Sequence, residues 1–317
     1  MRLATIRMHG EEIGAIVTQE GILPIRALNQ YLHTRWEESV FGLIRTGQLQ
    51  ELNEWFMDGG MQRLAQLPGR IDERSAQYAP LYRHPRQIFG IGLNYRDHAK
   101  DIGDAPPQGF PGSFLKLEDT IIGHGDEIRL PELPQATRTT AEAELGIIMG
   151  RDCRDVPPER WMDAIAGFTT ILDMTEESIL KGNEFVEGNP RYLTIVKNFP
   201  TFFSFGPQMV TPDEIADVEQ LQVQSILNGE VFAENIVANM THKPARLVSL
   251  HSSIQGWHAG DVLSTGTPRA FPIVDGDQAE CRITGPDGFE MHPLKNPVKG
   301  RQKSVTPCKG FIGQMNP

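Results

Sequence analysis

The sequence predicts an α+β protein of mixed β type, with a small N-terminal α/β domain followed by a larger domain in which strands dominate. Apolar residues at helical spacing are concentrated in residues 27–66, and strand-like apolar runs dominate from about residue 80 onward. Strands and helices do not alternate regularly, which disfavours a doubly wound sheet or a TIM barrel.

The N-terminal part of the 317-residue chain combines both periodicities. Residues 2–25 read as three short strands ("LATIRM", "IGAIVT", "GILPI"), and residues 27–66 predict helices with glycine breaks between them. Residues 67–87 lose periodicity and look like a linker. We therefore divide the chain into a small α/β domain, 1–80, and a catalytic domain, 81–317. The N-terminal domain is either a dimerisation element or a support for a lid.

The second domain has few helix signals. The strand-like runs are 87–93, 144–150, 165–173, 221–227, 261–265 and 279–284. The helix candidates are 95–102, 158–163, 211–216 and 244–256. Between them, "DIGDAPPQGFPGSFLK" (101–116) is rich in Gly and Pro and predicts an irregular loop, of a kind that serves enzymes as a lid.

Composition excludes several classes of function. The formal net charge of -11 and the pI near 5.3 disfavour a nucleic-acid or anionic-membrane surface, which needs a basic stripe. No apolar run is long enough for a signal peptide or a membrane span. The three cysteines form no CxxC pattern, so neither a zinc module nor a disulfide framework is expected. We expect a cytoplasmic enzyme that binds neither nucleic acid nor membrane.

The stretch "TTAEAELGIIMGRD" (139–152) places two acids at the head of an apolar strand. On a strand, residues i and i+2 share a face about 6.6 Å apart, so Glu142 and Glu144 can converge on one ion. Buried carboxylates need a partner, and a divalent cation is one. The alternative is a solvated face on which both residues are ordinary surface charge.

A third acid has a similar setting. Asp173 in "IAGFTTILDMTEES" (165–178) is the first charge after a long uncharged run. Such an acid is commonly a cap or turn residue. If it joins the Glu pair, the site is all oxygen, which favours Mg²⁺ or Mn²⁺, with Ca²⁺ as a further candidate, over zinc or copper.

The second domain resembles the fumarylacetoacetate hydrolase family across roughly residues 85–300. The stretches that carry the resemblance, in the family's order, are "IFGIGLNYRDHAKDIG", "FLKLEDTIIGHGDEIRLP", "AEAELGIIMGRD", "IAGFTTILDMT", "FFSFGPQMVTPDEI", "LNGEVF" and "AGDVLSTGTP". The resemblance implies a β-roll catalytic fold, usually dimeric, so a homodimer is expected. It also implies an E-x-E pair and a later Asp as metal ligands, which here are Glu142, Glu144 and Asp173.

The resemblance assigns further roles. The loop after "GxNY", which includes Tyr95 as a substrate contact, carries a His and an acid that activate water; here these are His98 and Asp101. Lys116 in "FLK" and Lys197 in "TIVKNFPTFF" match lysines that stabilise developing negative charge. A solvent-facing helix start and ordinary surface lysines are the alternatives.

Substrate contacts match less well. Thr267 in "TGTP" corresponds to a turn near the substrate, or has a purely structural turn role. The family's Arg that clamps a substrate carboxylate is Glu177 here, which reverses the local charge. Three other usual family residues are also replaced, by Leu180, Pro200 and Ala233. We therefore expect a substrate other than the usual dicarboxylates.

With these residues, the resemblance implies a divalent-metal-dependent hydrolase that cleaves a carbon–carbon bond in a 1,3-dicarbonyl or acylpyruvate-type 2-oxo acid. Decarboxylation, isomerisation, hydration or cyclisation of a 2-oxo or enol substrate on the same site are the enzymatic alternatives. A metal-binding scaffold without turnover is the alternative from another class.

Overall fold

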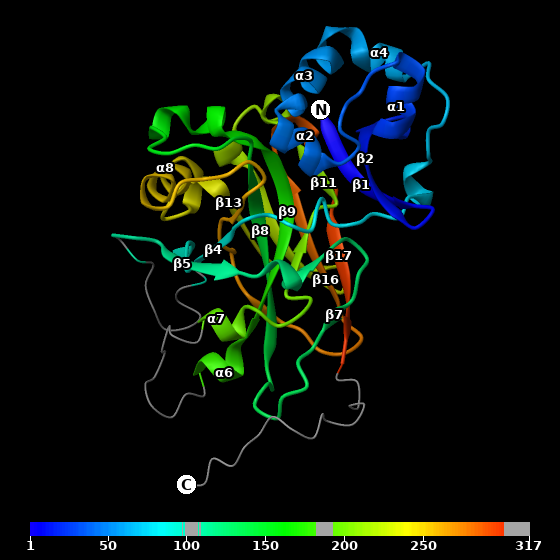
Figure 1. Ribbon diagram of the computed structural model, residues 1–317. Coiled ribbons are helices and arrows are strands. Elements are labelled where there is room, and N and C mark those ends of the chain that lie inside the picture. Colours follow the sequence, from blue (N-terminus) through cyan, green and yellow to red (C-terminus); the bar gives the residue numbers. More distant parts are fainter. Residues whose placement is uncertain (97, 99–106, 108, 182–192, 301–317) are drawn as a thin grey trace, which may run out of the picture.

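The computed structural model describes residues 1–96, 98, 107, 109–181 and 193–300 (Figure 1). The described chain folds into two β-sheets with peripheral helices, which confirms the predicted α+β class. Within these ranges, no helix combines the length and the apolar character needed to cross a membrane.

The larger sheet has twelve strands, and its main path runs β3-β2-β1-β11-β9-β8-β14-β4-β5. β10 pairs with β6 and β9, and β15 pairs with β8. The bounds are β1 Arg2–Met8, β2 Glu11–Thr18, β3 Gly21–Pro24, β4 Ile88–Gly92, β5 Gly112–Lys116, β6 Ile121–Ile122, β8 Thr139–Met149, β9 Ile165–Glu176, β10 Phe203–Phe205, β11 Gln208–Val210, β14 Val262–Ser264 and β15 Phe271–Pro272.

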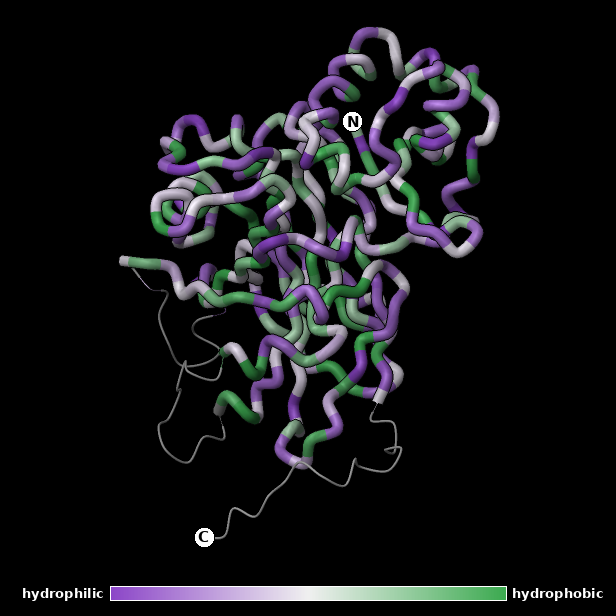
Figure 2. Tube along the Cα trace, viewed as in Figure 1, coloured by the Kyte–Doolittle hydropathy of each residue, from purple (hydrophilic) through white to green (hydrophobic). Residues whose placement is uncertain are grey.

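The smaller sheet has five strands in the order β13-β12-β16-β17-β7. Their bounds are β7 Ile128–Arg129, β12 Gln222–Leu227, β13 Glu230–Ile236, β16 Gln278–Thr284 and β17 Leu294–Lys299. β12 and β16 contact β8, and β16 and β17 contact β9, so the two sheets pack against each other. Their facing side chains form one core cluster, and hydrophobic segments are frequent in the centre of the molecule (Figure 2). Burial of this apolar area is the main favourable term in folding.

The helices lie at the periphery. Their bounds are α1 Ile25–Leu32, α2 Val40–Thr46, α3 Gln48–Trp55, α4 Met61–Leu64, α6 Glu177–Lys181, α7 Leu193–Val196 and α8 Pro244–Ile254. Local sequence explains α2: the Ser39 side chain accepts a hydrogen bond from Gly42 N at its start, and Gly47 takes a left-handed conformation at its end. A wide turn, η1 Phe56–Gly60, joins α3 to α4.

Short 3₁₀ turns complete the described structure: η2 Glu73–Ser75, η3 Glu118–Thr120, η4 Pro158–Ala164, η6 Pro212–Glu214, η7 Val218–Gln220, η8 Val237–Asn239 and η9 Pro286–Gly288. Two of them, η4 and η6, occupy segments where the sequence predicts helices. Both begin with Pro, which fixes φ at a helical value but donates no backbone hydrogen bond.

The N-terminal strands extend the larger sheet. Arg2 pairs with Val210 and Ala4 with Gln208 across the β1–β11 ladder. Residues of α1, α2 and α3 share a core cluster with β9, β10 and β14. The strands expected over 2–25 and the helices expected over 27–66 are present; the division at residue 80 stays a prediction.

The structure corrects one segment. The loop expected over 101–116 ends in a strand, since Gly112–Lys116 form β5 and pair with β4. Pairing with "IFGIG" supplies the backbone hydrogen bonds that the Gly/Pro composition alone does not predict. Residues 101–106 and 108 lie outside the described residues.

Candidate active site

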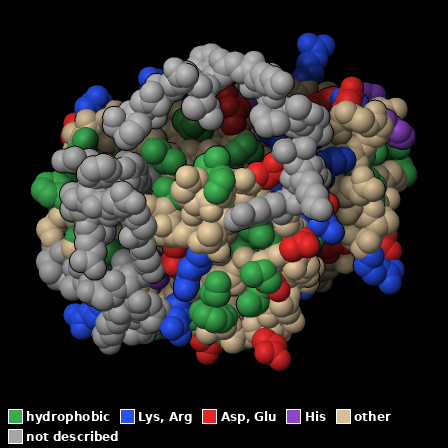
Figure 3. All heavy atoms as spheres, turned by 90° about the horizontal axis from the view of Figure 1, so that it is seen from below, with side chains coloured by type: hydrophobic (Ala, Val, Ile, Leu, Met, Phe, Trp, Pro, Cys, Tyr) green, Lys and Arg blue, Asp and Glu red, His purple; other side chains and the backbone are tan. Residues whose placement is uncertain are grey.

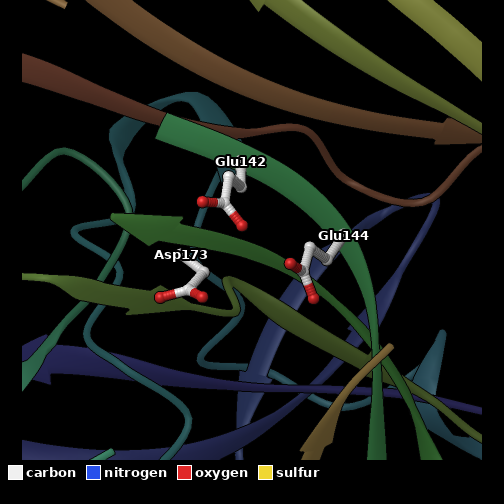
Figure 4. A group of neighbouring side chains, drawn as sticks. All are labelled: Glu142, Glu144 and Asp173. Carbon is white, nitrogen blue, oxygen red and sulfur yellow. The ribbon is translucent and has the colours of Figure 1, made fainter. Parts of the chain in front are cut away.

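The long antiparallel pair β8–β9 holds three acids together. Glu142 lies directly opposite Asp173, and Glu144 follows two residues later on the same face of β8. Figure 4 shows the three side chains extending into a common space from the two strands. Each offers one oxygen, and these oxygens lie within 4.8 Å of one another. Glu142 is 6% exposed, and Glu144 and Asp173 are fully buried, so the solvated-face alternative does not apply.

Hydroxyl and backbone donors fix two of these carboxylates. Ser264 Oγ and Gly266 N donate to Glu144 Oε2 over 2.5 and 2.7 Å. Thr175 Oγ1 donates to Glu142 Oε1 over 2.5 Å. Sequence reasoning missed all three donors. For Thr175 the signal is present, because residues i and i+2 on a strand share a face and Thr175 is two residues from Asp173.

Gly266 cannot be replaced without movement. Its φ is +99°, and a Cβ there would come within 2.7 Å of Asn94 Cβ. Glycine adopts this conformation without strain. The tight turn after β14 thereby brings a backbone N–H onto Glu144.

Two buried lysines neutralise most of the acidic charge. Lys116 Nζ donates to Asp173 Oδ1 and to Lys197 O, each over 2.5 Å. Lys197 Nζ lies 2.6 Å from Asp173 Oδ2 and 3.0 Å from both oxygens of Glu142. Lys116 thus contacts protein acceptors and orients Asp173, while Lys197 bridges two acids from β8 and β9.

Burial and neighbouring charges shift the pKa values of the cluster in different directions. Burial, reinforced by the charges of Asp173 and Glu142, raises the pKa of Glu144 to about 8. Burial opposes ionisation of Glu142 too, but Lys197, His98 and the Thr175 hydrogen bond outweigh it and lower its pKa. Burial lowers the pKa of Lys116 to about 8 despite its contact with Asp173. The pKa of Lys197 is raised, because the acids around it outweigh its burial.

The residues present fit a divalent cation. Glu144 Oε1 is buried and has no hydrogen-bond partner among the described residues. The Tyr95 hydroxyl is also buried without a partner there, and the charge of Glu144 contributes to the raised pKa of Tyr95, after burial itself. An unpartnered carboxylate oxygen beside two further carboxylates is a donor set of hard oxygens, which suits Mg²⁺ or Mn²⁺.

His98 lies beside this cluster. Its side chain is buried, Ala270 N approaches its Nδ1 at 3.5 Å, and its proximity helps to lower the pKa of Glu142. Its expected partner Asp101, and with it most of the expected lid, lies outside the described residues.

The two remaining expected residues, Thr267 and Glu177, contact residues outside the three acids. Thr267 is buried, and its Oγ1 donates to Arg269 O over 3.2 Å, while the preceding Gly266 supplies the donor to Glu144. Glu177 begins α6 and forms an ion pair with Arg138, with Nε and Oε2 3.0 Å apart. Sequence reasoning missed Arg138.

Comparisons with known proteins identify the family. Residues 87–299 match the family model described as fumarylacetoacetate (FAA) hydrolase C-terminal. An uncharacterized protein of Pyrococcus horikoshii is 35% identical over 211 residues, which cover 66% of this chain and 89% of the relative.

Two solved structures illustrate the range of similar enzymes. Maleylpyruvate hydrolase from Sphingobium sp. SYK-6, in complex with manganese(II) and pyruvate, is 26% identical with a TM-score of 0.74, covering 95% of this chain and 100% of that one. The 5-carboxymethyl-2-hydroxymuconate delta-isomerase from Mycobacterium smegmatis is 25% identical with a TM-score of 0.68, covering 96% and 100%.

Proposed function

The chain belongs to the fumarylacetoacetate hydrolase family, and we propose that it hydrolyses a carbon–carbon bond in a 1,3-dicarbonyl 2-oxo acid of the acylpyruvate type, with a bound Mg²⁺ or Mn²⁺. The observation that carries the proposal is the buried Glu142, Glu144 and Asp173 cluster with an unpartnered Glu144 oxygen, next to His98. The similar hydrolase whose structure contains manganese and pyruvate supports it.

Glu142, Glu144 and Asp173 would hold the cation, which, when bound, supplies Lewis-acid polarisation of a substrate carbonyl. His98 takes a proton from water, and the resulting hydroxide forms a bond to the distal carbonyl carbon. The bond between that carbon and its neighbour then breaks, and the neighbour keeps the electron pair and takes up a proton. The products are a carboxylic acid and a shorter 2-oxo acid.

The other residues of the site prepare this step. Lys197 keeps a positive charge between Glu142 and Asp173, where negative charge would develop on the substrate. Lys116 positions Asp173. Asp101 is proposed to orient His98, and Tyr95 and Thr267 to line the substrate space. The homodimer and the cytoplasmic location stay predictions.

The test is turnover of a panel of acylpyruvates with Mn²⁺ by wild-type protein and by His98→Ala. We expect kcat to fall about 10²- to 10⁴-fold in the variant, as for loss of a general base. Affinity for Mn²⁺, measured by calorimetry, should stay unchanged in His98→Ala and be lost in Glu142→Gln. Unchanged turnover without His98 refutes its role, and full Mn²⁺ affinity without Glu142 refutes the ligand set.

Isomerisation is the second candidate, because a delta-isomerase resembles the chain about as closely as the hydrolase does. Product analysis by mass spectrometry separates the two. Hydrolysis gives two fragments and consumes water, whereas isomerisation gives one product with the mass of the substrate.

A further inference from the structure

A buried asparagine joins two segments of the site that are far apart in the sequence. Asn94 is 1% exposed and lies in the loop after β4, which also carries His98. Its Nδ2 donates to Thr265 O over 2.7 Å, and Thr265 begins the turn after β14, in which Gly266 N donates to Glu144. Asn94 therefore connects the loop of the proposed base to the turn that fixes a proposed metal ligand.

Three side-chain hydrogen bonds hold Asn94 in place. Besides the bond to Thr265 O, its Nδ2 donates to His242 O over 2.9 Å, and its Oδ1 accepts from His242 N over 2.8 Å. Its backbone oxygen accepts from Thr241 N over 2.8 Å. Because both Nδ2 hydrogens and the carbonyl oxygen are used, a rotation of the side chain would break bonds to two other segments at once.

The backbone brings the loop and the turn into direct contact. Leu93 has a φ of +58°, which is uncommon for a residue other than Gly. In the turn, a Cβ at Gly266 would lie 2.7 Å from Asn94 Cβ and 3.0 Å from Ile91 O. A strained residue such as Leu93 persists only where the surrounding structure fixes it, and here the bonds of Asn94 do so.

The same two segments meet again at His98. Ala270, four residues after Gly266, directs its N–H at His98 Nδ1 over 3.5 Å. A shift of Asn94 relative to Thr265 would therefore move His98 relative to the acids. A displacement of about 1 Å in a catalytic group costs about 10²-fold in rate.

Water has little access to the bonds of Asn94. Figure 3 shows the surface at the end of the molecule that carries α6 and α7, where charged side chains of both signs lie beside hydrophobic ones. By contrast, Thr265 is fully buried and His242 is 6% exposed. Removing the Asn94 side chain would leave two buried backbone carbonyls without this donor.

We propose that Asn94 is a positioning residue that sets His98 relative to Glu144, by joining the loop after β4 to the turn after β14. This rests on the proposed function and deepens it, because it names the side chain that holds the base and the metal site in register. Within the described residues, the side-chain hydrogen bonds of Asn94 go to backbone groups. Asn94 therefore acts through His98 and through the Gly266 donor.

Asn296 provides a matched control within the chain. It is fully buried in β17 and has the same bonding pattern. Its Nδ2 donates to Gly123 O over 2.7 Å and to Asp126 O over 2.8 Å, and its Oδ1 accepts from Ser204 Oγ over 2.8 Å. These partners belong to neither the loop after β4 nor the turn after β14. Asn296→Ala thus removes an equal set of bonds and leaves the two segments of the site joined.

Kinetics with an acylpyruvate and saturating Mn²⁺ test the inference. Asn94→Ala should lower kcat about 10²-fold and change KM by less than about threefold, whereas Asn296→Ala should keep the wild-type values. In a His98→Ala background, Asn94→Ala should lower kcat by less than about twofold further, because residues that act as a unit are not additive.

Affinity for Mn²⁺, measured by calorimetry, gives a readout that does not depend on turnover. Asn94→Ala should raise the Kd for Mn²⁺ about tenfold, since groups that orient metal ligands tune affinity. Asn296→Ala should leave the Kd unchanged.

Equal effects of the two substitutions on kcat and on Mn²⁺ affinity would make Asn94 a purely structural residue and overturn the inference. Full additivity of Asn94→Ala with His98→Ala would also overturn it. If circular dichroism shows that Asn94→Ala does not fold, Asn94→Ser and Asn296→Ser are compared by the same criteria.

If wild-type protein turns over no acylpyruvate, the proposed function fails for this substrate class. The Mn²⁺ affinities then decide the inference. Weaker binding in Asn94→Ala alone supports it, and equal affinity in wild type and both variants overturns it. A wild-type protein that binds no Mn²⁺ overturns both the proposed function and the inference.

Discussion

Replacing Glu144 by Gln should stabilise the metal-free protein near neutral pH. Burial and two neighbouring acids raise the pKa of Glu144 from 4.5 to about 8. Because the folded state binds this proton more tightly than the unfolded state does, the associated stability is present below pH 4.5 and is lost as pH rises towards 8. The raised pKa of Glu144 therefore lowers the free energy of unfolding by about 3 kcal/mol at pH 7 and by less than about 1 kcal/mol at pH 5.

The amide removes this ionisation. Its carbonyl oxygen can accept from Ser264 and Gly266 as Glu144 Oε2 does, and its NH₂ group would face the other acids. We expect Glu144→Gln to raise the free energy of unfolding by about 1–3 kcal/mol at pH 7, with a smaller gain at pH 5. Urea denaturation in excess EDTA, from pH 5 to pH 8, measures this difference.

Glu176 supplies the control. It is fully buried on β9, but Thr139 Oγ1 donates to it over 2.6 Å and Arg138 N over 3.1 Å. Since its hydrogen bonds are satisfied, Glu176→Gln should lower stability. A Glu144→Gln variant that is less stable than wild type at pH 8, or that keeps the wild-type pH dependence, refutes the reasoning.

Three further predictions concern the support of the site and the second sheet. Gly266→Ala should lower the free energy of unfolding by at least about 2 kcal/mol more than Gly276→Ala. Both glycines have positive φ, but a Cβ at Gly276 meets no atom within 4 Å. Urea denaturation compares the two variants, and equal losses of stability would contradict the steric argument. Thr175→Val should cost about 1–3 kcal/mol in the same measurement, since it removes the donor to Glu142; an unchanged stability would mean that this hydrogen bond is not formed. Burial, followed by the charge of a neighbouring histidine, lowers the pKa of His124 from 6.5 to about 4. The associated stability is therefore present above pH 6.5 and is lost as pH falls towards 4. His124→Gln should reduce the loss of unfolding free energy between pH 6.5 and pH 4, and an unchanged loss would refute the assignment.

The strands and their acids were predictable because they depend on short-range patterns. An i, i+2 pair of glutamates on an apolar strand needs only the period of two to share a face. Asp173 was predictable as the first charge after a long uncharged run. The register that sets it opposite Glu142 is observed only in the structure.

Long-range contacts were not predictable from local sequence. Arg138 follows the strand period as Glu142 does, yet its contact with Glu177 depends on the β8–β9 register. Lys116 and Lys197 come from β5 and the end of α7, and only the packing of these elements makes them partners of Asp173. β11 escaped prediction because three residues, Gln208–Val210, carry too little periodicity to identify a strand.

The β1–β11 ladder has a consequence for synthesis of the chain. β2 can pair with β1, and β3 with β2, early. On the other edge of β1, residues 77–79 bond to Thr5–Arg7, but Arg2–Ala4 pair with residues 208–210. At ribosomal rates of about 5–20 residues per second, that partner is made roughly 10–40 s later. During this interval the first residues of β1 present an open strand edge, which is a template for pairing with another chain. Chaperone demand during translation should therefore end only when β11 has emerged.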